Sequence, residues 1–175
     1  MLDWNDLRFF LELQRSGRLL TAARRLNTTH ATVARHIEAI EKSLWSAADT
    51  LRAMAASLAE DFQGDLVRIV AFEAVDGIDD ADWLQVIAEG DARLSGFRDL
   101  ADSGEPVCGR LHPDKNALLY GVRAEEVQSS ALLVLPGTGL VAVGSRDPNR
   151  FFPGMGTLFL RMMGEALTAA LQRFR

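Results

Sequence analysis

The amino-acid sequence predicts an α+β fold, in which an all-helical N-terminal segment is followed by an antiparallel sheet with flanking helices. Two observations predict this fold. Apolar residues recur at three- and four-residue steps up to about residue 62 and again near the C-terminus, a spacing typical of amphipathic helices. Between these regions, short β-branched runs alternate with Gly and Pro, which is typical of strands and hairpins. A chain of 175 residues is long enough for a small module and an ordinary domain.

Composition and charge exclude several classes of protein. The hydrophobic fraction of 48% and the charged fraction of 25% are ordinary globular values, which exclude a disordered or collagen-like chain. The net charge of −5 argues against a uniformly basic nucleic-acid coat protein. Residues 1–43, however, carry seven basic and five acidic side chains, and five arginines lie between Glu12 and Glu38 with no acid among them. The N-terminal segment is therefore either a binding surface or a solvated helical face.

Cysteine use and hydropathy indicate the compartment. Cys108 is the only cysteine, so neither an intrachain disulfide nor a multi-cysteine metal site can form. The N-terminus lacks the basic start and apolar run of a signal peptide. No stretch approaches the roughly 18 to 20 apolar residues of a membrane span. We therefore expect a cytoplasmic protein with no membrane partner.

Three helices are predicted in the first 43 residues. The first begins near Asp3, the second covers residues 19–26 and ends before Asn27, and Thr28 or Thr29 caps the third. Two helices joined by a turn of three or four residues, with small alanines at their crossing, are typical of a helix-turn-helix.

A helix-turn-helix places the start of its second helix against base edges and nearby cations against phosphates. We therefore expect double-stranded DNA as a partner, bound by a homodimer. The expected DNA-binding residues are Arg18, Arg24, Arg25, Thr28, Thr29, His30, Thr32, Arg35 and His36.

Residues 1–44 also resemble a known family. The pattern Ser16-Gly17, Thr21-Ala22-Ala23, Leu26 and the run THATVAR at 29–35 resembles the DNA-binding segment of LysR-type transcriptional regulators. The resemblance implies that residues 29–36 form the recognition helix. Thr29 and His30 stand where that family usually has Ser and Gln. The β-wing that follows in the family is missing after residue 44, so we expect weaker DNA affinity.

The remaining elements are predicted from residues 45–175. An amphipathic helix covers 45–62 and a last helix 155–174, while strands are predicted over 66–72 and 107–111. A short helix leads to Tyr120, and residues 130–135 and 139–144 form a hairpin around Pro136-Gly137-Thr138.

This part of the chain resembles a second family. Cys108-Gly109-Arg110-Leu111, Gly144-Ser145-Arg146-Asp147 and the run RFFPGMGTLFL at 150–160 resemble the C-terminal part of bacterial domain-of-unknown-function family 484 over residues 46–175. The resemblance implies a GAF-like fold in a cytoplasmic bacterial protein, with no established ligand or reaction. We expect this domain to sense a ligand or to dimerise, with helices 45–62 and 155–174 as the dimer contact. The candidate ligand-binding residues are Cys108, Arg110, Ser145, Arg146 and Phe151. Joining the two resemblances makes the chain a natural fusion or a chimera.

The two segments together predict a sequence-specific DNA-binding transcriptional regulator with a GAF-like sensor or dimerisation domain. The alternative is a GAF-like protein that binds a partner or small ligand and no DNA. We expect no enzyme and no cofactor, since Cys108 is better read as a packed hydrophobe. We also expect no metal site, because the acidic residues lack the calcium-loop pattern; they are Asp76, Asp79, Asp80 and Asp82.

Overall fold

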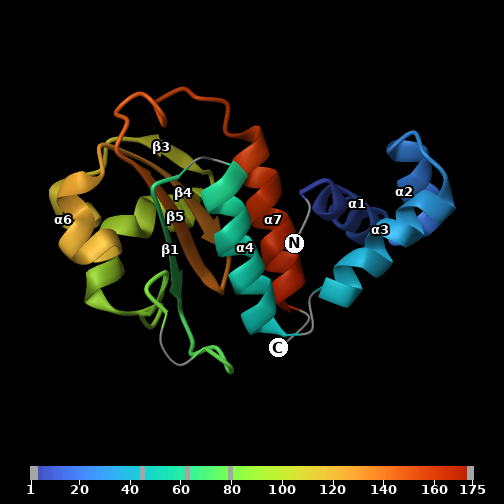
Figure 1. The fold of residues 1–175 in the computed structure, drawn as a ribbon, viewed down its shortest axis with the longest axis horizontal. Helices are drawn as coiled ribbons and strands as arrows, with labels where there is room; N and C mark the ends of the chain where they lie inside the picture. The colour runs from blue at the N-terminus through green and yellow to red at the C-terminus, as the bar shows by residue number, and fades with distance from the viewer. Residues whose placement is uncertain (1–3, 44–45, 62–63, 79–80, 173–175) are drawn as a thin grey trace.

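The computed structural model describes residues 4–43, 46–61, 64–78 and 81–172. Within these residues the chain forms an open five-stranded sheet with helices on both faces and a group of three N-terminal helices beside it (Figure 1). The predicted α+β class is therefore confirmed. No described helix is long and apolar enough to cross a membrane.

Three N-terminal helices pack around a small core of their own. They are α1 (Trp4–Ser16), α2 (Leu19–Arg25) and α3 (His30–Ser43). Phe9 and Val33 are buried against Ala22 and Ala23, and the small alanine side chains allow the helices to approach closely. Asn27 has a φ of 51°, the left-handed conformation predicted for the exit from α2.

The starts of the third and fourth helices are set by side-chain caps. The Thr29 hydroxyl accepts a hydrogen bond from the Thr32 N–H at 3.1 Å, so Thr29 rather than Thr28 caps α3. The Ser46 hydroxyl accepts from the Asp49 N–H at 3.1 Å and caps α4 (Ala47–Asp61). The chain therefore starts a new helix after α3. The predicted cap Asp3 and the predicted helix positions Trp45 and Phe62 lie outside the described residues.

The sheet has the strand order β2-β1-β5-β4-β3. Its strands are β1 (Leu66–Ala71), β2 (Leu84–Val86), β3 (Val107–Gly109), β4 (Ser129–Leu135) and β5 (Gly139–Ser145). The predicted β4–β5 hairpin is present, with Leu135 paired with Gly139 next to the turn.

The expectation of a fully antiparallel sheet was wrong at one edge. β2 pairs parallel to β1, with Ile69 opposite Leu84. The Ile69 N–H donates to the Trp83 carbonyl at 2.6 Å, and the Ile87 N–H donates to the Ala71 carbonyl at 2.9 Å. Three residues between acidic loops show no alternation that sequence reasoning could detect, so β2 was missed.

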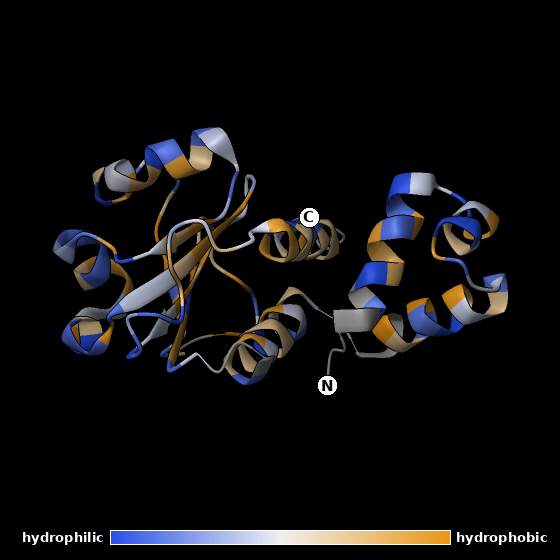
Figure 2. Cartoon of the chain, turned by 90° about the horizontal axis from the view of Figure 1, so that it is seen from above, coloured by the Kyte–Doolittle hydropathy of each residue, from blue (hydrophilic) through white to orange (hydrophobic). Residues whose placement is uncertain are grey.

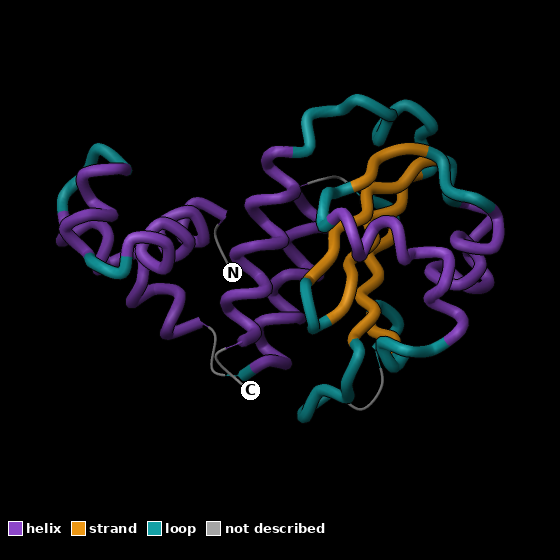
Figure 3. The backbone as a smooth tube through the Cα atoms, turned by 180° about the vertical axis from the view of Figure 1, so that it is seen from behind, coloured by secondary structure: helices purple, strands orange, loops and turns teal. Residues whose placement is uncertain are grey.

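Alternate strand residues face two separate cores. On one face Ile69, Leu133 and Val141 pack with α4 and α7 (Leu158–Gln172). On the other face Val70, Leu132 and Leu140 pack with shorter elements, and Figure 3 shows helices on both sides of the sheet. These elements are η1 (Ala92–Phe97), α5 (Arg98–Ser103), α6 (Pro113–Tyr120) and η2 (Gly121–Glu126).

Two predicted boundaries need correction. The last helix begins at Leu158 rather than at 155, because a turn with Gly154 at a φ of 86° precedes it. β3 ends at Gly109 rather than at 111, because Gly109 has a φ of 143°, which does not continue a strand. Residues 173–174 of the predicted last helix lie outside the described residues.

Gly139 of β5 leaves no room for a side chain beside β1. A Cβ at this position would lie 2.0 Å from the Val70 carbonyl oxygen, and central strand backbones cannot move apart without breaking their ladder. We expect Gly139→Ala to lower the free energy of unfolding by about 3 kcal/mol, as overpacking does. Urea denaturation measures this change. Gly90→Ala is the matched control, because a Cβ at Gly90 meets nothing within 4 Å; equal losses in the two variants would contradict the prediction.

Candidate functional site

The predicted DNA-binding residues lie on the two helices farthest from the sheet. α3 begins at the outer end of the N-terminal group, and α1 is the helix of that group that contacts α7 (Figures 1 and 2). Arg18, Arg24, His30 and Arg35 are all exposed, and none of them forms an ion pair with a described residue. The three arginines are therefore available to an anionic partner, with the His30 ring beside them as a hydrogen-bonding group.

Other predicted DNA-binding residues already have partners within the chain. The Arg25 guanidinium donates to the Glu12 carboxylate at 3.0 Å. The Thr29 and Thr32 hydroxyls lie 2.9 Å apart and hydrogen-bond each other. Thr28 is half-buried, and its N–H donates to the Ala23 carbonyl at 2.9 Å. The Arg25–Glu12 pair joins α2 to α1, and the hydrogen bonds of Thr29 and Thr32 fix the start of α3.

His36 is part of the helical core rather than of the exposed face. Its ring stacks on Phe9 with centroids 4.0 Å apart and an interplanar angle of 10°. Its Nδ1 hydrogen-bonds the Asp6 carboxylate on α1. The sequence placed His36 one residue after Arg35 in the recognition helix, but successive helical residues point in different directions, so the two side chains have different surroundings.

One exposed cation was missed by sequence reasoning. Arg8 on α1 is exposed, and its guanidinium lies 5.7 Å from the centre of the Phe9 ring. It lines a hollow of about 300 Å³ together with Arg15 and Arg25. The sequence spacing of Arg8 and Arg15 could have indicated that the two side chains lie together, because residues seven apart are two helical turns apart and share a face of α1.

The candidate ligand residues Ser145 and Arg146 belong to a network of ion pairs and hydrogen bonds. The Asp65 carboxylate accepts from the Ser145 hydroxyl at 3.2 Å and from the Arg146 N–H at 2.7 Å. The Arg146 side chain donates to the Glu126 carboxylate, which also accepts from Arg123 at 3.0 Å. The network ties the start of β1 to the end of β5.

The other three candidate ligand residues lie apart from this network. Cys108 and Phe151 are buried in the same core as α4 and α7, and burial raises the pKa of the Cys108 thiol. Arg110 is exposed and donates to the Gln128 side chain at 2.6 Å. The hollows of about 450, 330 and 220 Å³ on the described surface are lined by other residues.

The acidic loop between β1 and β2 contains the four aspartates that were weighed as a cation site. Two of them, Asp79 and Asp80, lie outside the described residues. Among the described residues, no three His, Cys, Asp or Glu side chains gather closely enough to hold a metal ion.

A comparison with known families identifies the chain. Residues 8–175 match the family described as "Protein of unknown function, DUF484", so the chain belongs to this family. The match begins in α1 and crosses the junction at residues 44–46. The expectation that the family likeness starts near residue 46 was therefore wrong, since the N-terminal helices fall within the match. No curated protein matches the chain.

The contacts of His36 predict its contribution to stability. His36→Ala removes the stacking on Phe9 and leaves Asp6 without this partner. We expect the free energy of unfolding to fall by about 2 kcal/mol, as for other losses of a buried contact network. His30→Ala is the control, because His30 is exposed and we expect a change within about 0.5 kcal/mol. Equal values from urea denaturation would show that His36 does not support the helical core.

The Glu126 carboxylate predicts a dependence of stability on pH. Hydrogen bonds from Arg123 and then Arg146 lower its pKa from 4.5 to about 2. Because the pKa is lower in the folded state, this stabilisation is complete above about pH 4.5 and is lost as the pH falls towards 2. We expect the stability difference between the native chain and Glu126→Gln to shrink over this range.

Urea denaturation at a series of pH values from 6 to 2.5 measures this difference. Glu125→Gln is the control, because Glu125 is exposed and makes no ion pair with a described residue. A difference for Glu126→Gln that stays constant with pH would contradict the assigned pKa shift.

Proposed function

We propose that the chain is a sequence-specific DNA-binding transcriptional regulator that reads a duplex with α2 and α3 and acts in the cytoplasm. The single observation that carries this proposal is a group of exposed arginines that form no ion pair with any described residue; the group consists of Arg18 at the start of α2, Arg24 on α2 and Arg35 on α3.

The local geometry supports a helix-turn-helix. α2 has seven residues, a turn of residues 26–29 follows, and α3 has fourteen residues. Ala22 and Ala23 are buried where the helices cross, which allows their backbones to approach closely. The resemblance of residues 1–44 to LysR-type regulators agrees with this geometry. In such a motif the first residues of α3 would contact base edges, with His30 and Arg35 as the available side chains.

The charges of the N-terminal helices support the same reading. Of the acidic side chains described there, Glu12 pairs with Arg25 and Asp6 with His36, while Glu38 is exposed on α3 beyond Arg35. Arg15 pairs with Glu165 of α7. The segment from Arg18 to Arg35, which contains no acid, therefore keeps a positive charge on a chain whose total charge is −5. Phosphate contacts by exposed arginines supply affinity without sequence selection.

The same proposal assigns a role to the sheet and its helices. A GAF-like arrangement would serve as a sensor or a dimerisation domain, with α4 and α7 as the contact between two copies. Leu158 and Phe159 at the start of α7 are exposed large apolar side chains, which suits such a contact. A two-fold dimer would place two α3 helices about one duplex turn apart.

A second function is supported by the contact between α1 and α7. This contact gives the N-terminal helices a structural role that needs no DNA. The chain would then be a GAF-like protein that binds a partner or a small ligand. A measurement of DNA binding distinguishes this function from the first, because only a transcriptional regulator needs to bind a duplex.

Paired arginine substitutions test the DNA-binding proposal. We expect the native chain to bind a labelled 30-base-pair random duplex, with log affinity falling linearly against log salt concentration. Arg24→Ala combined with Arg35→Ala should reduce this slope by about 2 and weaken binding by roughly tenfold or more near 0.1 M salt. Selection from a randomised duplex pool should enrich one sequence with the native chain and not with Arg35→Ala.

The control removes the same charge elsewhere. Arg98→Ala combined with Arg110→Ala alters two exposed arginines of the sheet-containing part, and we expect an unchanged salt slope. Absence of duplex binding at 50 mM salt, or equal slopes for the two double variants, would contradict the proposal and favour the second function.

A further inference from the structure

A hollow of about 220 Å³, the hairpin hollow, lies between the turn of the β4–β5 hairpin and the elements η1 and α5. It opens onto the core that η1 and α5 share with the sheet, and six apolar side chains of that core line it: Phe72, Leu94, Phe97, Leu100, Val134 and Leu140. Sites for drug-sized molecules are somewhat larger, so a hollow of this size suits a smaller molecule.

The hairpin hollow exists because the core is covered unevenly at this end of the sheet. Leu94, Phe97 and Leu100 follow one another at three-residue steps, so their buried side chains share one face of η1 and α5. The turn opposite them carries Pro136 and Gly137, which have little side chain to extend over the core. The space between this face and the turn therefore stays open.

Two charged side chains of opposite sign line the hairpin hollow. They are Glu89, in the segment between β2 and η1, and Arg98, at the start of α5. Both are exposed, and neither forms an ion pair with the other or with any other described residue. Their neighbours Asp91 and Arg93, by contrast, pair with each other at 2.7 Å. One carboxylate and one guanidinium are therefore left unmatched beside an apolar surface.

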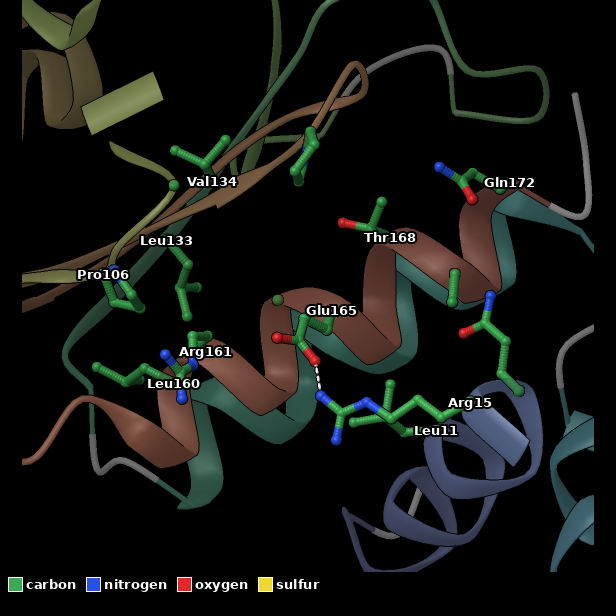
Figure 4. A pocket seen from close by; sticks show the side chains of 15 residues that line it. Leu11, Arg15, Pro106, Leu133, Val134, Leu160, Arg161, Glu165, Thr168 and Gln172 are labelled. Carbon is green, nitrogen blue, oxygen red and sulfur yellow. Dashed lines mark hydrogen bonds and ion pairs between the residues drawn. The ribbon is translucent and has the colours of Figure 1, made fainter. Parts of the chain in front are cut away.

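The larger hollow of about 450 Å³ beside α1 and α7 has a different charge pattern. Its Arg15 pairs with Glu165 across the contact between the two helices, as Figure 4 shows, and its Arg161 pairs at 3.3 Å with Glu105. The charged residues of that lining are thus already matched within the chain. The unmatched charges that would attract a charged molecule line the hairpin hollow instead.

We propose that the hairpin hollow binds an apolar α-amino acid in its zwitterionic form. The carboxylate of the amino acid accepts hydrogen bonds from the Arg98 guanidinium, whose planar fork matches a carboxylate. Its ammonium group donates to the Glu89 carboxylate, and its side chain covers Phe72, Leu94 and Leu140. A ligand with a single charge would leave one of the two charged residues unmatched. This site goes beyond the proposed DNA binding and does not depend on it.

Isothermal titration calorimetry of the full chain with L-leucine tests the proposal. We expect saturable binding at one site per chain. Binding should be weaker for 4-methylpentanoate, which lacks the ammonium group, for isopentylamine, which lacks the carboxylate, and for glycine, which lacks the apolar side chain. Glu89→Gln and Arg98→Gln should each weaken L-leucine binding by roughly three- to tenfold, because each removes one charged partner at an exposed position.

Asp99→Asn is the charge control, because Asp99 is exposed next to Arg98 but does not line the hollow. Ala101→Leu places a larger side chain on the wall of the hollow and should weaken binding, whereas Ala117→Leu, at an exposed position of α6 outside the hollow, should not. Circular dichroism checks that each variant is folded. Absence of saturable L-leucine binding, equal affinity for either singly charged analogue, or equal effects of Glu89→Gln and Asp99→Asn would overturn the proposal.

Discussion

Nine of the fifteen residues of helix α7 are buried, and the arrangement of the N-terminal helices, α4 and the sheet depends on this packing. Leu160, Met163 and Leu167 belong to the core that the helix shares with the sheet and α4. Gly164 lets the helix approach the Val134 carbonyl, where any side chain would be crowded. α1 packs on the same helix, and Arg15 reaches Glu165 across that contact. A helix with so few exposed positions joins the N-terminal helices to the sheet through apolar burial, with the ion pair at its margin.

The distribution of charge follows from this packing. Arg15, near the contact with α7, pairs with a carboxylate, while Arg18, Arg24 and Arg35 form no ion pair within the described part of the chain. At the opposite end of the molecule, Arg123 and Arg146 are held by Glu126 and Asp65. The same residue type therefore stabilises the fold in one place and remains available for a partner in another. The total charge of −5 reveals neither arrangement.

Local signals made much of the fold predictable. Thr29 and Asn27 mark the ends of helices by their own hydrogen bonding and conformation, and Pro136-Gly137-Thr138 forms a turn between two apolar runs. Features that depend on distant contacts were missed. β2 is held by backbone hydrogen bonds to β1, and His36 points to Asp6, thirty residues earlier. The candidate interface was predictable in part: its residues were named from the sequence, but which of them are exposed and unpaired was not.

The sequence by itself determined the α+β class, the three N-terminal helices and the uneven charge, because periodicity, caps and composition are local properties. The tertiary structure decided which arginines lack an ion pair with a described residue, and how the Asp65 and Glu126 carboxylates hold Arg146. Each of these depends on contacts between segments that are far apart in the chain. No pattern within a single segment specifies the packing of segments that are far apart in the chain.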